Sequence, residues 1–235
     1  ITKDGIPIDI KINAGLVSDL DHLSTLGVAG VGLYRTEIPF MMGQDFLKMD
    51  EQVRIYQAMI EGAFPYPITF RTLDVGGDKI LPYLTQKEEA NPMMGWRAIR
   101  IGLDRPMLLR TQLRALLKAA AGQTLQVMFP MLTNLEEFLR AKELLHMEMD
   151  YAKVHNILPP FDVKIGAMIE VPSLVWSLPD IIPHVDFLSL GTNDLCQFFF
   201  AADRGNPYIS KRYDTLSPSF LSYLGHIQQV VQASG

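Results

Sequence analysis

The sequence predicts an α/β fold, because short apolar runs typical of buried strands alternate with longer amphipathic patterns typical of helices. The chain has 235 residues, of which 48% are hydrophobic, so it is long enough for one α/β barrel or two small domains. Polar or charged residues cluster after every strand-like run. This clustering at the carboxyl ends of strands is typical of the active face of a barrel, and it favours a barrel over other α/β arrangements.

The strand-like runs lie at 8–13, 30–34, 68–70, 125–131, 163–169 and 186–190. Helical patterns lie between them; Leu109, Leu113, Leu116 and Leu117, for example, share one helix face. A closed (β/α)8 barrel needs eight such units and about 250 residues. We therefore predict one domain over residues 1–235, a TIM-type (β/α)8 barrel truncated to about six strand–helix units. An open, doubly wound parallel sheet of six strands is the alternative.

Composition excludes several classes of protein. The formal net charge is −5, a poor match to nucleic acid, which needs a basic protein face. The single cysteine, Cys196, excludes an intrachain disulfide framework and fits a reducing cytosol. No apolar run is long enough to span a membrane. We therefore expect a cytoplasmic protein that binds neither nucleic acid nor membrane.

Two carboxylates follow neighbouring strand-like runs. Glu170 comes directly after the run 163–169, and Asp194 follows the run 186–190. Either one alone could instead accept hydrogen bonds from backbone amides at a helix N-terminus. As a pair at the carboxyl ends of adjacent parallel strands, they can share a hard cation, and their oxygen ligands favour Mg²⁺ or Mn²⁺ over Zn²⁺. The sequence therefore predicts a magnesium site at Glu170 and Asp194.

Arginines lie close to these carboxylates in the predicted barrel. Arg35 and Arg71 each follow a strand-like run directly, and Arg204 lies shortly after Asp194. The planar guanidinium fork binds two oxygens of a phosphate or carboxylate at once. A single arginine at a strand end is more often a surface residue or half of an ion pair, and Glu37 and Asp74 are available as such partners. Two of them after successive strands favour a small anionic substrate, since barrel loops converge on one site.

A long connection, 74–96, separates the third strand-like run from the next helical pattern. Most βα loops have about 2–6 residues, and longer ordered ones tend to be functional. Gly76 allows the backbone to approach a ligand closely. Arg97 closes the loop and could reach the substrate. Cys196 follows Asp194 by two residues, and we expect it to be a small buried hydrophobic residue.

Several longer motifs occur in order along the chain. They are Gly-Leu-Tyr-Arg-Thr-Glu at 32–37, Arg-Thr-Leu-Asp-Val-Gly-Gly-Asp-Lys at 71–79, Asn-Pro-Met-Met-Gly-Trp-Arg-Ala-Ile-Arg at 91–100, Met-Phe-Pro-Met at 128–131, Met-Ile-Glu-Val-Pro at 168–172, Gly-Thr-Asn-Asp-Leu at 191–195 and Asp-Arg-Gly-Asn at 203–206. Together they resemble the phosphoenolpyruvate (PEP)-binding barrel of enzyme I of the bacterial phosphotransferase system. The resemblance runs from about residue 4 to residue 218, and the stretch 34–41 is closer to the nitrogen-branch paralogue than to the sugar-transport enzyme.

The resemblance implies a role for each matching residue. Glu170 and Asp194 would hold Mg²⁺, which bridges PEP and neutralises charge as the phosphoryl group leaves. PEP itself would be bound by Arg35, Arg71, Lys79, Arg97, Asn193, Asp194 and Arg204.

The resemblance also implies a PEP–protein phosphotransferase that passes the phosphoryl group to a histidine on a separate N-terminal domain and then to a small histidine phosphocarrier protein. Such enzymes form homodimers through this domain. No histidine here lies in the phosphoacceptor motif, and the chain ends before the Cys-Gly-Glu motif of the seventh strand. We therefore expect a fragment without catalytic residues of its own, lacking the N-terminal domain and the last strands, and inactive alone. The alternatives are a pyruvate phosphate dikinase or PEP synthase barrel, or a regulatory PEP-sensing dimerisation module.

Overall fold

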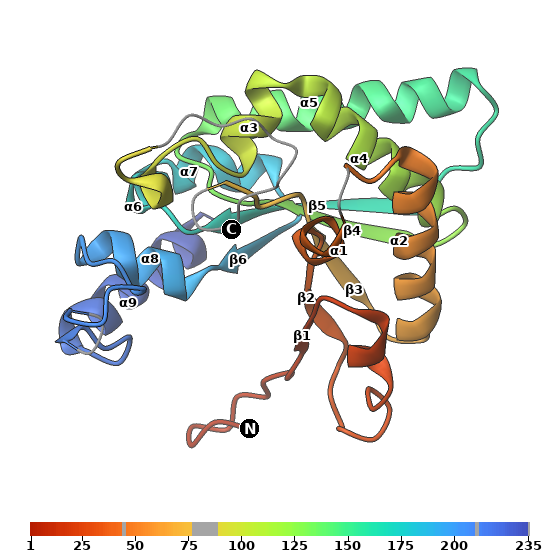
Figure 1. Cartoon of the computed structure of the whole chain (residues 1–235). Coiled ribbons are helices and arrows are strands. Elements are labelled where there is room, and N and C mark those ends of the chain that lie inside the picture. Colours follow the sequence, from red (N-terminus) through yellow and green to blue (C-terminus); the bar gives the residue numbers. More distant parts are fainter. Residues whose placement is uncertain (44–45, 77–88, 210–211, 235) are drawn as a thin grey trace.

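The structure is a computed structural model that describes residues 1–43, 46–76, 89–209 and 212–234 (Figure 1). In this part of the chain one parallel sheet contains six strands in sequential order, β1-β2-β3-β4-β5-β6. A sequential order is that of a TIM-type barrel, whereas a doubly wound sheet reverses its order at a switch point. The predicted α/β barrel of about six units is therefore confirmed, and the doubly wound alternative is wrong. The strands are Ile12–Ala14 (β1), Val31–Arg35 (β2), Ile68–Arg71 (β3), Thr124–Phe129 (β4), Asp162–Ile169 (β5) and Phe187–Leu190 (β6).

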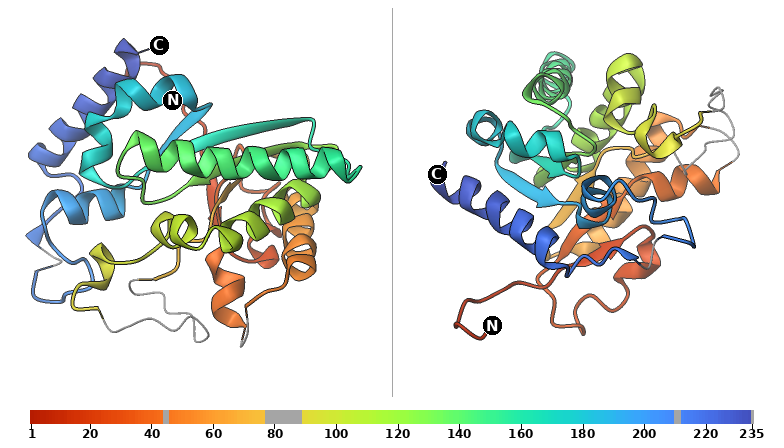
Figure 2. Two further views of the ribbon diagram at one scale, coloured as in Figure 1. Left: turned by 90° about the horizontal axis from the view of Figure 1, so that it is seen from above. Right: turned by 90° about the vertical axis from the view of Figure 1, so that its left-hand side faces the viewer.

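Helices connect the strands and cover the outside of the curled sheet, as both views of Figure 2 show. Helix α2 packs against α4, and α4 packs against α5, so these helices are neighbours along the outer layer. The helices are Glu37–Met42 (α1), Met49–Ala63 (α2), Ile99–Asp104 (α3), Pro106–Ala119 (α4), Leu135–Val154 (α5), Pro172–Trp176 (α6), Leu178–Ile181 (α7), Thr192–Phe199 (α8) and Pro218–Ala233 (α9), with 3-10 turns at Val17–Leu20, Pro92–Met94 and Ile182–His184.

The core lies between the sheet and these helices. The apolar stripe predicted for α4 is buried: Leu113 and Leu116 are 0% exposed. Next to it, Tyr34 of β2, Tyr56 of α2 and Phe70 of β3 form an edge-to-face cluster with ring centroids 5.3–6.4 Å apart. This packing fixes α2 and α4 against β2 and β3, which carry two of the predicted site arginines at their ends.

Two strand boundaries differ from the prediction by more than one residue. The first strand begins only at Ile12, and Ile8 and Ile10 are exposed, because β1 pairs with β2 over three residues only. The fourth strand ends at Phe129 rather than residue 131, because Pro130 has no N–H to donate and Met131 has a positive φ of 55°. No helix in the described ranges has the length and apolar character needed to cross a membrane.

Candidate functional site

A cleft with a volume of about 330 Å³ opens at the carboxyl ends of the strands. Residues of the first strand, of the last strand and of the start of α8 are among those that line it. The structure thereby brings most of the predicted site residues together. The predicted residues that line the cleft are Arg35, Arg71, Glu170, Asn193, Asp194 and Arg204. Arg97 lies directly behind it, bound to Asp194, whereas Lys79 falls outside the described residues.

Arg71, the last residue of β3, lies at the centre of an ion-pair cluster. Its Nη2 is 2.7 Å from Glu37 Oε1 and 2.9 Å from Asp74 Oδ2, and its Nη1 is 3.6 Å from Glu170 Oε1. Burial lowers the pKa of Arg71, but the carboxylates of Asp74, Glu37 and Glu170 outweigh it and raise the pKa overall. Arg71 therefore stays charged, and the expected structural partners Glu37 and Asp74 are confirmed.

Arg97 is a second buried arginine, with only 1% of its side chain exposed. Its Nη2 lies 3.0 Å from Asp74 Oδ1 and 3.1 Å from Asp194 Oδ2, so it joins the two carboxylates. Gly76 makes this position accessible: it has φ +95°, and a Cβ there would lie 2.5 Å from Trp96 O and 2.8 Å from Arg97 Cα. The glycine in the long loop thus allows close approach to the Arg97 backbone, and Arg97 holds Asp194 from behind.

The remaining cations face the cleft more openly. Arg35 lies opposite Arg71 in the register of the β2–β3 strand pair. Its side chain is exposed at the cleft and makes no ion pair or hydrogen bond with any described residue. Arg204, whose side chain is 44% exposed, lies with Nη1 3.2 Å from Asp194 Oδ1. Asn193 is also exposed at the cleft. These three side chains are placed to bind an anion that enters the cleft.

Glu170, at the end of β5, is buried against the neighbouring strands. Its Oε2 accepts a hydrogen bond of 2.8 Å from the Met131 N–H. Gly191 packs so closely that a Cβ there would lie 2.4 Å from Glu170 Cγ. Burial raises the pKa of Glu170 to about 7; Asp74 and Asp194 also raise the pKa, whereas Arg71 and the Met131 N–H lower it. In this buried environment, a cation bound beside Glu170 would stabilise the charged form of its carboxylate.

A divalent metal fits these residues. Within the described ranges no three His, Cys, Asp or Glu side chains form a cage for a metal ion. Mg²⁺ needs no such cage, because it is commonly held by one or two carboxylates together with waters and substrate phosphate oxygens. The buried Asp194 Oδ1 accepts no hydrogen bond, although Arg204 lies at ion-pair distance. The carboxylates of Glu170 and Asp194, which line the cleft, offer oxygen donors of the kind that Mg²⁺ requires.

Other residues of this region were not predicted from the sequence. Asn13 of β1 and Ser189 of β6 line the cleft. Asn13 could have been noticed, because it is the polar last residue of the strand-like run 8–13. Ser189 gives no such signal, because it lies inside its strand. Cys196 is buried, with 7% exposed, and does not line the cleft, in agreement with the expected small hydrophobic residue.

The fold and the cleft define a barrel-type α/β protein whose strand ends gather arginines and carboxylates around an open cleft. The family model described as "PEP-utilising enzyme, PEP-binding domain" matches residues 1–235. The chain therefore belongs to the family of PEP-utilising enzymes. The resemblance to the PEP-binding barrel of enzyme I is confirmed at this level.

Curated relatives are similar along the whole chain. The chain is 43% identical over 237 aligned positions to a "Phosphoenolpyruvate-dependent phosphotransferase system" protein of Escherichia coli K12, and 39% identical to a "Phosphoenolpyruvate-protein phosphotransferase" of Streptococcus equinus. A protein with the latter name from Haemophilus influenzae is 41% identical. These alignments cover 99–100% of this chain but only 31%, 41% and 40% of the respective relatives. The chain thus spans less than half the length of the curated relatives it matches.

Two solved structures support the fold alone. The citrate synthase SbnG has a TM-score of 0.53 at 15% identity, with 96% of this chain and 75% of that chain covered. A citrate lyase from Burkholderia xenovorans LB400 has the same TM-score and identity, with 100% of this chain and 65% of that chain covered.

Proposed function

We propose that residues 1–235 form the PEP-binding domain of a PEP–protein phosphotransferase. The observation that carries this proposal is the cleft itself, in which Arg35 and Arg204 face solvent beside the carboxylates Glu170 and Asp194. PEP carries a phosphate and a carboxylate, which match exposed guanidinium groups. The names of the relatives supply the reaction class, phosphoryl transfer from PEP.

Each side chain has a distinct part in the proposed reaction. Arg35 and Arg204 would bind the phosphate and carboxylate oxygens, and Asn193 would donate a hydrogen bond to the phosphate. Arg71 and Arg97 would complete the positive side of the cleft while they hold the acidic residues in place. Lys79 is proposed as a further binding residue on the resemblance alone.

Mg²⁺ held by Glu170 and Asp194 would supply charge neutralisation to the phosphoryl group. Phosphoryl transfer of this kind depends mainly on positioning and on stabilisation of negative charge, which the arginines provide. The bond between phosphorus and the enol oxygen of PEP would break while a bond between phosphorus and a histidine nitrogen forms, and the enolate of pyruvate would leave. We propose that this histidine belongs to a separate domain and that a small histidine phosphocarrier protein receives the group next.

The finer assignment is the nitrogen branch. The chain covers 31% of the E. coli relative but 40–41% of the S. equinus and H. influenzae relatives, so the E. coli protein is longer. Additional length is expected of nitrogen-branch enzymes, which carry an N-terminal sensory domain, and the identity of 43% to this longer relative supports the same branch. The homodimer is proposed on the resemblance alone, whereas the cytoplasmic location is also supported by the single cysteine, which fits a reducing cytosol.

The second candidate is a module that senses PEP without taking part in its turnover. The same cleft would serve it, so PEP binding does not separate the two candidates. Phosphoryl transfer from PEP to a histidine of the parent protein does separate them. A dikinase or PEP synthase is less favoured, because the curated relatives carry phosphotransferase names.

The test is a calorimetric titration of PEP into the chain with and without Mg²⁺. We expect saturable binding that requires Mg²⁺. The double variant Glu170→Gln/Asp194→Asn should lose this requirement, because it removes both proposed metal ligands. Glu143→Gln/Asp180→Asn is the matched control, since it makes the same charge change at two exposed positions.

Two outcomes would contradict parts of the proposal. A folded wild-type chain that binds no PEP would contradict PEP binding by this domain. Binding of PEP that is equally tight without Mg²⁺ would contradict the metal assignment and leave the arginine assignment standing.

A further inference from the structure

Four buried polar side chains form a hydrogen-bonded network behind the cleft. They come from the β2–α1 junction and from helices α2 and α4, and their exposed fractions are 0–2%. The members are Thr36, Gln52, Tyr56 and Gln112. Because a buried polar group is costly unless it is paired, such a network holds its elements in one arrangement.

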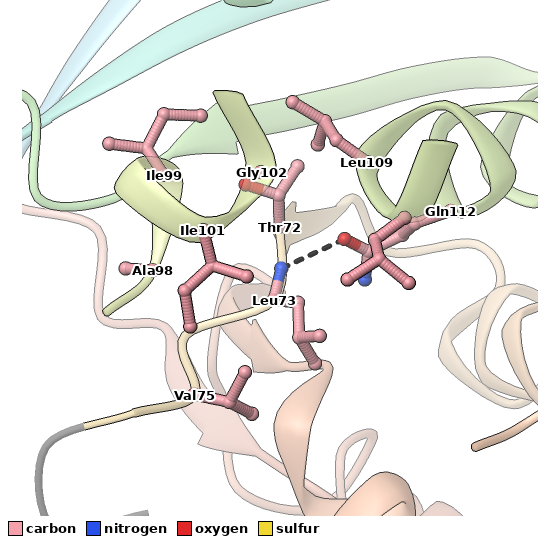
Figure 3. Close-up of a pocket in the computed structure, with 10 residues that line it drawn as sticks. Thr72, Leu73, Val75, Ala98, Ile99, Ile101, Gly102, Leu109 and Gln112 are labelled. Atoms are coloured by element: carbon pink, nitrogen blue, oxygen red, sulfur yellow. Dashed lines mark hydrogen bonds between the residues drawn. The ribbon is translucent and has the colours of Figure 1, made fainter. Parts of the chain in front are cut away.

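Gln112 of α4 is the centre of this network. Its Nε2 donates to Thr36 Oγ1 at 3.0 Å and to Tyr56 OH at 3.1 Å. Its Oε1 accepts from the Leu73 N–H at 2.8 Å, the bond drawn in Figure 3. Both amide protons and the carbonyl oxygen are therefore used, which fixes the orientation of the side-chain amide.

The partners of Gln112 lie beside the charged residues of the cleft. Thr36 is flanked by Arg35 and Glu37, and Thr36 Oγ1 also donates to the backbone carbonyl of Arg71 at 2.8 Å. Leu73 directly precedes Asp74. One glutamine thus reaches both segments, 35–37 and 71–74, from the helix layer.

The surroundings of Leu73 make this contact hard to replace. Its N–H points toward α4 beside a small cavity of about 20 Å³ with a mainly apolar lining that includes Val75 and Leu109 (Figure 3). The neighbouring Thr72 N–H donates to Met128 O, and Val75 O accepts from the Ala98 N–H. Strand β4 and the Ala98 backbone therefore hold the two sides of Leu73, and Gln112 holds Leu73 itself.

We propose that Gln112 is a positioning residue for PEP binding, which acts by fixing segment 35–37 against segment 71–74. This inference rests on the proposed function of the cleft. It explains a polar residue in the buried stripe of α4, where Leu109, Leu113 and Leu116 are apolar. Gln112 touches no substrate in this proposal; it sets the spacing of Arg35 and Arg71 through Thr36 and Leu73.

The test compares Gln112→Met with Gln52→Met. Gln52 is as buried as Gln112 and belongs to the same network, but among the described residues its side chain hydrogen-bonds only with Tyr56 OH and Leu47 O. Both variants should lower the melting temperature. Only Gln112→Met should also weaken PEP binding, by about tenfold, because misplaced binding groups lose affinity and rate steeply. Only Gln112→Met should speed amide hydrogen exchange at Leu73.

A third variant keeps the test decisive if Gln112→Met does not fold. Gln112→Glu, in the neutral form that burial favours, still accepts from Leu73 and donates one hydrogen bond. Gln112→Glu should show smaller changes in PEP affinity and in amide exchange at Leu73 than Gln112→Met, which loses the side-chain amide completely.

The outcomes separate this inference from the proposed function. If the wild-type chain binds no PEP, the proposed function fails, and exchange at Leu73 still decides whether Gln112 holds the segment. If PEP binds and the folded Gln112 variants match Gln52→Met in affinity and in Leu73 exchange, the positioning role of Gln112 is overturned.

Discussion

Gly191 leaves no room for a side chain beside Glu170. A Cβ at this position would lie 2.4 Å from Glu170 Cγ and 2.7 Å from Glu170 Oε1. Glu170 cannot yield easily, because it is 3% exposed and hydrogen-bonded to the Met131 N–H. We expect Gly191→Ala to weaken Mg²⁺-dependent PEP binding by about tenfold or more, measured by calorimetry.

Gly225→Ala is the matched control for this substitution. Gly225 lies within α9, and a Cβ there would have no atom within 4 Å. Alanine should therefore leave PEP affinity unchanged and stabilise the helix by roughly 0.5–1 kcal/mol. Equal PEP affinity in the two variants would show that the contact between Gly191 and Glu170 does not shape the site.

The protonation of Glu170 predicts a pH dependence. Its pKa in the folded, metal-free protein is raised from 4.5 to about 7, chiefly by burial. The folded state thus holds a proton that the unfolded state releases between these values, so the free energy of unfolding falls as pH rises from 4.5 to about 7. The slope approaches 1.4 kcal/mol per pH unit at most. Thermal melts across this range should show the trend, and Glu170→Gln should flatten it.

Binding of Mg²⁺ should follow the opposite trend with pH. The Glu170 carboxylate has to lose its proton before it can bind a metal, so affinity for Mg²⁺ should rise as pH increases through about 7. A metal affinity that is constant across this range would remove Glu170 from the ligand set.

Individual site residues differed in how far the sequence could reveal them. Arg71, Glu170 and Asp194 were predictable, because each is a charged residue at the end of an apolar strand or within a few residues after it. Gln112 was not, because its hydrogen-bonding partners Leu73 and Thr36 lie 39 and 76 positions away in the sequence. A polar residue in an apolar helix stripe has no distinctive meaning until the fold shows what it faces.

At the scale of elements, the α4–α5 contact contains a buried carboxylate. Glu148 of α5 is 0% exposed and lies 2.6 Å from Arg110 Nε and 2.5 Å from Arg114 Nε, both on α4. Arg114 also lies over the Tyr151 ring, 3.7 Å from its centroid. The two arginines are about one quarter exposed and can be hydrated, whereas Glu148 cannot.

This asymmetry predicts unequal costs of substitution. Arg110→Met/Arg114→Met leaves a buried carboxylate without a partner and should destabilise the protein by roughly 3–5 kcal/mol. Glu148→Met leaves two guanidinium groups that can turn to water and should cost clearly less. Denaturant unfolding of both variants measures the difference. An equal or reversed order would show that the burial of Glu148 does not set the cost of breaking these ion pairs.

Strands were predicted better than their boundaries. All six apolar runs became strands, because a buried parallel strand needs a continuous apolar sequence. The limits of β1 and β4 depended on factors outside the runs: the short pairing of β1 with β2, and the lack of an N–H in Pro130. Strand pairing is a property of two segments, so one segment read alone cannot fix where it stops.

At the scale of the whole molecule, the cleft connects the two ends of the sheet. Asn13 lies on β1 and Ser189 on β6, and both line the same cavity. A ligand bound there should therefore stabilise the complete fold rather than one part. At a PEP concentration of about 100 times the dissociation constant, with Mg²⁺ present, we expect a stabilisation of about 2.7 kcal/mol.

A thermal melt measures this stabilisation as a single transition moved to higher temperature. The Glu170→Gln/Asp194→Asn variant should show a smaller shift under the same conditions. A shift confined to one of two separate transitions would indicate that the strands at the two ends of the sheet unfold independently.

The balance of charges around the cleft has a consequence for how PEP and Mg²⁺ affect each other's binding. Among the described residues in and directly behind the cleft, carboxylates and guanidinium groups are equal in number: Glu37, Asp74, Glu170 and Asp194 against Arg35, Arg71, Arg97 and Arg204. PEP alone would add uncompensated negative charge to this balance, and Mg²⁺ alone would add uncompensated positive charge. Together they largely cancel, so each should raise the affinity for the other by the same factor. The cleft would then be occupied to a large extent only when Mg²⁺ and PEP are both present.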